Sequence, residues 1–161
     1  MATVQEETIK VTSPAKQKKD YVFAVGRRKE SVARVRVYKA VREDLMWDTV
    51  QIKKGDILVN KLPISEYFGT DTMRHLYSEP LRVANAQNKY TITIRVAGGG
   101  KAGQLVAATH GIARALSEID PENHKPALKK QGFLVRDSRA RQRRMVGTGG
   151  KARRAKQSPK R

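Results

Sequence analysis

The sequence contains no cysteine, and aromatic side chains make up only 6% of its 161 residues. Without cysteine, neither a disulfide framework nor a thiolate metal site is possible. The three histidines, His75, His110 and His124, lie far apart and show no spacing typical of metal ligands. We therefore expect neither a metal nor another cofactor.

Long apolar runs are also missing, since none approaches the ~20 residues needed to span a bilayer. The N-terminus carries Glu6 and Glu7 and no apolar core, so it resembles neither a signal peptide nor a transit peptide. We expect a cytoplasmic protein. From Leu134 onward there is no aromatic residue to insert into a membrane surface, which argues against membrane as a partner.

Acidic residues are few as well, with 15 Asp and Glu against 34 Lys and Arg, for a formal net charge of +19. Residues 136–161 contain eleven of these basic residues and one acid, and so contribute +10. Met145 and Val146 are the only sizeable apolar residues there, too few to offset the entropy of ordering. We predict a basic arm, disordered in free solution, that binds nucleic-acid phosphates.

The remaining chain divides into a flexible polar leader, 1–20, and a globular body, 21–135, of mixed α/β structure. Hydrophobic patterns predict strands at Tyr21–Val25, Ser31–Tyr38, Ile57–Val59 and Tyr90–Val96, with a last edge strand at Phe133–Val135. In the fourth of these strands, Ile92, Ile94 and Val96 are expected on one face, with Thr91, Thr93 and Arg95 on the other. Trp47, in the mixed segment 41–56, is expected to pack within that segment.

Helical turns are predicted at 63–68 and from Asp71 or Thr72 to a point before Pro80. A longer helix follows Gly103, because apolar residues recur there at helical spacing: Leu105, Ala108, Ile112, Leu116 and Ile119. A final helix is expected to start at 120–122 and to end by Gly132.

Basic residues cluster around the turn after Gly26. Arg27, Arg28 and Lys29 are followed by Arg34 and Arg36, which alternate with apolar residues on the predicted strand. Such a run is often a solvated turn, but five basic groups within ten residues favour a nucleic-acid contact.

A glycine-rich loop, 98–103 (GGGKAG), lies between the fourth strand and the long helix. Glycines allow close approach of an anion to the backbone, and a helix N-terminus presents free N–H groups. The loop lacks the Walker ending, and no nearby acid is placed to hold magnesium. A tight structural turn, with or without a contact to an RNA phosphate, is the better interpretation. His110 is interpreted as a hydrogen-bonded helix residue.

With these features in place, the chain resembles the bacterial-type small-subunit ribosomal protein S9 (uS9) family from about Tyr21 to Arg161. Four blocks in order carry the resemblance: 26–35 (GRRKESVARV), 60–69 (NKLPISEYFG), 98–104 (GGGKAGQ) with 110–116 (HGIARAL), and 132–139 (GFLVRDSR) before the basic arm.

The resemblance implies a two-layer α/β body of the ribosomal S5 domain 2-like type, with a left-handed βαβ crossover. It also implies a non-enzymatic protein in the head of the small ribosomal subunit, in contact with 16S-type rRNA and neighbouring head proteins. The residues expected to bind rRNA are Arg27, Arg28, Lys29, Arg34, Gly98, Gly99, Gly100, Lys101, Gln104, Arg114, Arg136, Arg139, Arg141, Arg143, Arg144, Lys151, Arg153, Arg154 and Lys156. Lys160 and Arg161 are expected to contact P-site tRNA.

Two departures from the family pattern stand out. The family usually ends in Gln, an aromatic residue, Ser, Lys and Arg, whereas this chain ends in 157–161 (QSPKR), without the aromatic residue and with a proline before the lysine. Segment 41–56 is longer than the usual connection. Two other classes stay open at this point: a phosphate-handling enzyme built on the same crossover, and a free basic DNA-binding protein.

Overall fold

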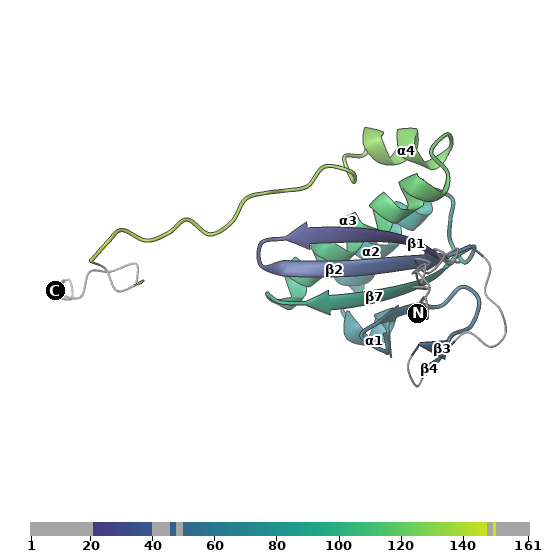
Figure 1. The fold of residues 1–161 in the computed structure, drawn as a ribbon, viewed down its shortest axis with the longest axis horizontal. Helices are drawn as coiled ribbons and strands as arrows, with labels where there is room; N and C mark the ends of the chain where they lie inside the picture. The colour runs from purple at the N-terminus through teal and green to yellow at the C-terminus, as the bar shows by residue number, and fades with distance from the viewer. Residues whose placement is uncertain (1–20, 40–45, 48–49, 148–149, 151–161) are drawn as a thin grey trace, which may run out of the picture.

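The computed structural model describes residues 21–39, 46–47, 50–147 and 150 (Figure 1). A five-stranded sheet is formed by β1 (Tyr21–Arg28), β2 (Ser31–Tyr38), β5 (Ile57–Val59), β6 (Leu62–Pro63) and β7 (Thr91–Ala97). A separate small hairpin consists of β3 (Met46–Trp47) and β4 (Val50–Gln51). The helices are α1 (Ile64–Tyr67), α2 (Asp71–Val83), α3 (Lys101–Ile119) and α4 (His124–Lys130).

The strands of the main sheet lie in the order β1-β2-β7-β5-β6. All neighbours are antiparallel except β5 and β7, which run parallel and are joined through α1 and α2. In Figure 1 the sheet lies in front of α2 and α3, so the helices cover one of its faces. The predicted two-layer α/β fold is confirmed, and the left-handed sense of the crossover stays a prediction.

The core lies between this sheet and α3. Ala33, Val35 and Val37 alternate along β2 and are fully buried, as the period-two pattern predicts. The long helix also buries its predicted stripe, with Ile112 and Leu116 at its centre.

Two glycines allow α3 to approach the sheet closely. A Cβ on Gly26 of β1 would overlap the carbonyl oxygen of Ala107. A Cβ on Gly111 of α3 would lie 2.6 Å from Cγ2 of Val35. Backbone therefore packs against backbone where α3 crosses β1.

Helix α2 is longer than predicted, because it passes through Pro80 and ends at Val83. A proline inside a helix removes one backbone hydrogen bond and normally ends the helix. Here Pro80 and Leu81 are both buried against the core. Burial of apolar surface outweighs the local preference, and the helix stops instead before Asn85, which has a φ of +48°.

The outer face of β7 is also partly covered. Thr91 and Thr93 lie on this face and are buried. Trp47 packs with Ile52 and Leu58, so it reaches beyond its own segment to β5. The Thr91 hydroxyl donates to the Lys53 carbonyl at 3.1 Å and accepts from the Gly55 N–H at 3.0 Å. These bonds satisfy a buried hydroxyl, which alternation alone does not reveal.

The end of the body differs in two details from the prediction. α4 begins at His124 and not at 120–122, where Asp120 accepts a hydrogen bond from the Asn123 N–H at 3.2 Å. The helix ends at Lys130, and Gly132 follows its C-cap in the predicted left-handed conformation, with a φ of +77°. Phe133–Val135 is a turn and not an edge strand. The Phe133 N–H bonds the carbonyl of Leu128 at 3.1 Å, which is the Schellman pattern.

Candidate nucleic-acid interface

The basic turn after Gly26 is the tip of the β1–β2 hairpin. β1 continues through Arg28, which pairs with Ser31, so Lys29 and Glu30 form a two-residue turn. Lys29 has a φ of +50°, as such tight hairpin turns require. Arg27 and Lys29 are exposed, whereas the Arg28 side chain is only 15% exposed.

The glycine-rich loop packs directly on this tip. The Ser31 hydroxyl donates to the Gly98 carbonyl at 3.2 Å, and Gln104 Nε2 donates to the same oxygen at 3.0 Å. A Cβ on Gly98 would overlap the Glu30 carbonyl oxygen, and one on Gly99 would overlap the Ser31 hydroxyl. Gly98 and Gly99 thus have a structural reason to be glycine, while Gly100 has open space around it.

Lys101 opens α3 beside this loop and lies over the ring of Tyr67. Its Nζ is 3.5 Å from the ring centroid and donates to the Tyr67 carbonyl at 3.3 Å. The Tyr67 hydroxyl in turn donates to Gln104 Oε1 at 2.8 Å. Lys101 is exposed, so its charge stays accessible at the surface, whereas the Gln104 amide is engaged at both ends.

The start of the arm is fixed to the same hairpin through Arg28. We call Arg28, Asp137 and Arg139 the arm root. Arg28 donates to the Arg139 carbonyl at 2.6 Å and forms an ion pair of 3.1 Å with the Asp137 carboxylate. Arg139 holds that carboxylate from the other side, with its Nη2 2.8 Å from Oδ2. Hydrogen bonds from Arg139, supported by the charge of Arg28, hold the pKa of Asp137 well below its usual range.

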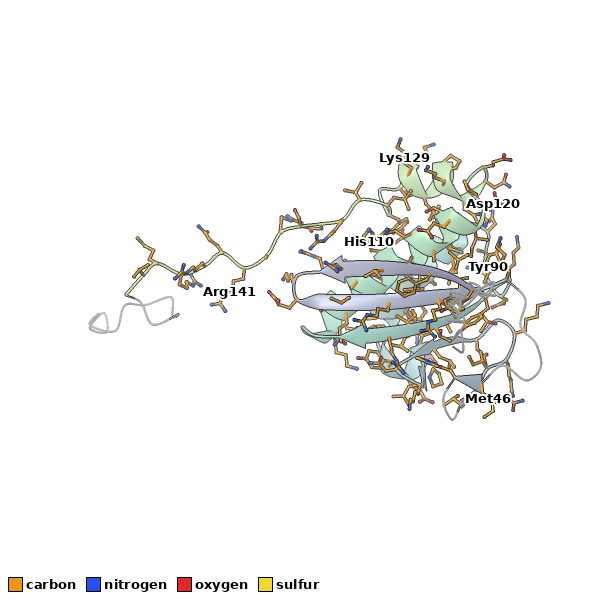
Figure 2. All side chains as sticks on the ribbon, in the orientation of Figure 1. Met46, Tyr90, His110, Asp120, Lys129 and Arg141 are labelled. Atoms are coloured by element: carbon orange, nitrogen blue, oxygen red, sulfur yellow. The ribbon has the colours of Figure 1, made fainter. Side chains whose placement is uncertain are left out.

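Past the arm root, residues 140–147 contain no helix or strand and are exposed. Figure 1 shows this part of the chain running away from the sheet and helices, and Figure 2 places Arg141 on it. The structure thus describes five of the predicted arm residues: Arg136, Arg139, Arg141, Arg143 and Arg144. Those that lie outside the described residues are Lys151, Arg153, Arg154, Lys156, Lys160 and Arg161.

Arg114 and His110 lie on α3, apart from the hairpin tip. The Arg114 guanidinium donates to the Val25 carbonyl at 2.7 Å, so it satisfies a backbone acceptor on the edge strand β1. Burial lowers the pKa of His110, against a hydrogen bond to the Leu134 backbone that raises it, while Arg114 and Arg136 lower it further. The neutral form of His110 is therefore favoured, and Glu79 lines the same recess as its ring.

The expected single basic stripe is divided between two faces of the sheet. Arg28 points to the helix side, where the glycine loop and the arm root lie. Arg27 and Arg34 alternate with it and belong to the opposite face, where Arg34 lies directly across from Arg95 of β7. Sequence reasoning missed Arg95 and the role of Asp137, although Asp137 is the single acid between 136 and 161.

Comparison with known proteins decides the class of the chain. The family model of ribosomal protein S9/S16 matches residues 26–161. The chain belongs to this ribosomal protein family. Two relatives, each named small ribosomal subunit protein uS9, are from Anaeromyxobacter sp. (strain K) and Anaeromyxobacter dehalogenans (strain 2CP-1 / ATCC BAA-258). Each is 42% identical over 128 residues, which cover 80% of this chain and 88% of the relative.

Ribosomal proteins of the S9/S16 family are structural and not enzymatic, so the phosphate-handling enzyme is excluded. The glycine loop agrees, because its backbone packs on the hairpin tip and on Ser31. In the described part of the chain, no group of three or more His, Asp or Glu could hold a metal ion. None of the described helices is long and apolar enough to cross a membrane.

Proposed function

We propose that this ribosomal protein is a structural constituent of the small-subunit head in the cytoplasmic ribosome. There its body and arm bind 16S-type rRNA, its surface meets neighbouring head proteins, and its C-terminal tip contacts P-site tRNA. The family match over 26–161 supports the ribosomal assignment, and the charge and geometry of the chain support the RNA contacts.

One observation supports the RNA assignment above all others. A basic, exposed segment leaves the body from a point that is held by specific contacts. Arg28 is committed to Asp137 and Arg139, so the arm starts from a defined point beside the hairpin tip. Beyond it, Arg141, Arg143 and Arg144 are exposed. A directed row of guanidinium groups without structure of its own suits threading between RNA helices, where each neutralised phosphate releases counterions.

Around the arm root, the body adds accessible charge. Lys29 lies at the hairpin tip on which the glycine loop packs, Lys101 lies where that loop enters α3, and both are exposed. Gly100 leaves open space there, so a phosphate can approach the backbone. Arg28 and Gln104, by contrast, act within the protein and position these elements.

The proposed tRNA contact is supported by the resemblance to the S9 family and by the length of the arm. A fully extended chain spans at most about 3.3–3.6 Å per residue, so an arm of 26 residues reaches roughly 90 Å. Lys160 and Arg161 would then lie far from the body, at the end of a charged segment.

Co-sedimentation tests the proposal. The tagged full-length protein should remain with 30S-sized particles after a high-salt wash, together with 16S-type rRNA. A variant that lacks residues 136–161 should be washed off at lower salt. Recovery of the full-length protein only in the particle-free fraction, at every salt concentration, would falsify the ribosomal assignment.

A further inference from the structure

The face of the sheet opposite α3 carries four arginines from three adjacent strands. They are Arg27 of β1, Arg34 and Arg36 of β2, and Arg95 of β7, and all four are exposed. Arg34 lies directly across from Arg95 on one side and from Val25 on the other, while Arg36 lies across from Phe23 and Thr93. β1, β2 and β7 contain no Asp or Glu.

These arginines concentrate positive charge on one face of the sheet. Arg34 and Arg95 lie directly opposite each other on the neighbouring strands β2 and β7. Arg36 gains a contact with the ring of Tyr21, 4.9 Å from its centroid, which fixes the guanidinium over the sheet. An exposed cluster of positive charge on an open sheet face suits a ligand of negative charge.

The surface beneath the arginines is apolar and open. Phe23 is 46% exposed in the middle of the charged residues, and Val25 and Val32 are half-buried beside it. Two shallow recesses, of about 80 and 520 Å³, run along this face from Trp47 to Arg27. Trp47 closes one end, since it packs over β5 with Ile52 and Leu58.

We propose that this open sheet face is a second RNA-binding surface, which takes a looped or single-stranded RNA segment apart from the arm and the hairpin tip. The proposal deepens the RNA-binding function proposed above and rests on it. Arginine guanidinium groups bind phosphates through several N–H donors and stack on bases, and Phe23 offers a flat ring to a further base.

Shape and charge distinguish this partner from others. A face three strands wide does not enter the groove of a duplex, which admits one helix or a two-stranded ribbon. An unpaired RNA segment can instead lie across the strands, with bases on Phe23 and phosphates on the arginines. The absence of acids from the three strands makes a basic protein partner unfavourable.

The test uses the full-length chain with Arg34→Gln/Arg36→Gln and, separately, Phe23→Ala. Affinity is measured for an RNA hairpin with a large loop and for a fully paired RNA duplex of the same length. Both measurements are made at the same salt concentration. The matched control is Arg74→Gln/Arg82→Gln, which removes the same charge from exposed positions of α2 in the helix layer.

We expect the Arg34→Gln/Arg36→Gln variant to bind the looped RNA about tenfold more weakly than the control variant. Phe23→Ala should lower the affinity for the looped RNA about fivefold and leave the affinity for the duplex unchanged, because only unpaired bases stack on the ring. Thermal unfolding should show that both variants are folded, so that lost binding is not lost structure.

Three results would overturn this proposal while RNA binding itself stands. One is an equal loss in the arginine variant and its control, and another is an equal effect of Phe23→Ala on loop and duplex. The third is a loss of affinity for poly-glutamate as large as that for RNA, which would indicate an acidic protein partner. If the unaltered protein bound neither RNA, the proposed function would fail together with this inference.

Discussion

Asp137 shows how one acidic residue directs a basic segment. Its carboxylate forms an ion pair with Arg28 of β1 and accepts a hydrogen bond from Arg139 of the arm. The chain is therefore held by two guanidinium groups at the point where it leaves the body. Without this carboxylate, Arg28 and Arg139 would repel each other. A residue that lowers the positive charge of the arm therefore defines where the arm begins.

The depressed pKa of Asp137 predicts a pH-dependent contribution to stability. Since the folded value lies below the unfolded value of about 3.9, the contribution is complete above that value and is lost as pH falls toward the folded one. Asp137→Asn should lower Tm at pH 7 by no more than about 3 °C, because Arg139, the main hydrogen-bond partner of this carboxylate, is largely exposed to solvent. The difference in Tm between variant and unaltered protein should shrink steadily below pH ~4.

Thermal unfolding followed by circular dichroism between pH 7 and 2.5 makes this measurement. Glu118→Gln, which neutralises an exposed acid on α3, serves as the control and should have no comparable pH profile. A difference for Asp137→Asn that stays constant or grows as the solution becomes more acidic would show that the arm root is not formed through this carboxylate.

At the level of elements, local patterns predict those parts of the fold in which one face is buried and the other is not. β2 was predicted with its bounds, because Ala33, Val35 and Val37 alternate with charged residues. The stripe on α3 is predicted for the same reason. Such patterns assign a residue to a face but do not show what covers that face, as with Thr91, which is buried and hydrogen-bonded to Lys53 and Gly55.

The candidate site was predictable as a set of residues but not as an arrangement. The structural turn expected at Gly98 and Gly99 is present, and its glycines allow the loop to pack on Glu30 and Ser31, while their contact with RNA stays a prediction. Arg28, whose contact with RNA stays a prediction, also binds Asp137 and Arg139 of the arm. Neither partner is near in sequence, so only the fold, which brings β1, α3 and the arm together, reveals these roles.

The close contact between α3 and β1 gives a prediction at this scale. Gly111→Ala should destabilise the fold by about 1–3 kcal/mol, because its Cβ would lie 2.6 Å from Val35 Cγ2 and 3.2 Å from the Gly26 nitrogen. Gly69→Ala is the matched control, since its nearest neighbours would be 3.9 Å away. Urea unfolding of both variants decides the matter, and equal stability would mean that α3 moves away from β1 without cost.

For the whole molecule, the distribution of charge predicts how RNA binding responds to salt. The logarithm of the association constant falls linearly with the logarithm of salt concentration, by about 0.7–0.9 per neutralised phosphate. Eleven basic residues lie between 136 and 161. Deleting that segment should therefore flatten the slope by several units in filter-binding assays with a 16S-type rRNA fragment. An unchanged slope would assign the phosphate contacts to the body.

The tip of the arm separates tRNA binding from rRNA binding. Lys160 and Arg161 supply two of the basic charges beyond residue 135, so their deletion should change the salt slope for rRNA by no more than about two units. The same deletion should weaken P-site tRNA binding to reconstituted small subunits, because it removes the only groups expected to reach the tRNA. Lys151→Ala/Arg153→Ala, which removes two charges within the arm, is the control and should leave tRNA affinity nearly unchanged. If both variants lower tRNA affinity equally, the tip acts only as part of the general charge of the arm and makes no contact of its own.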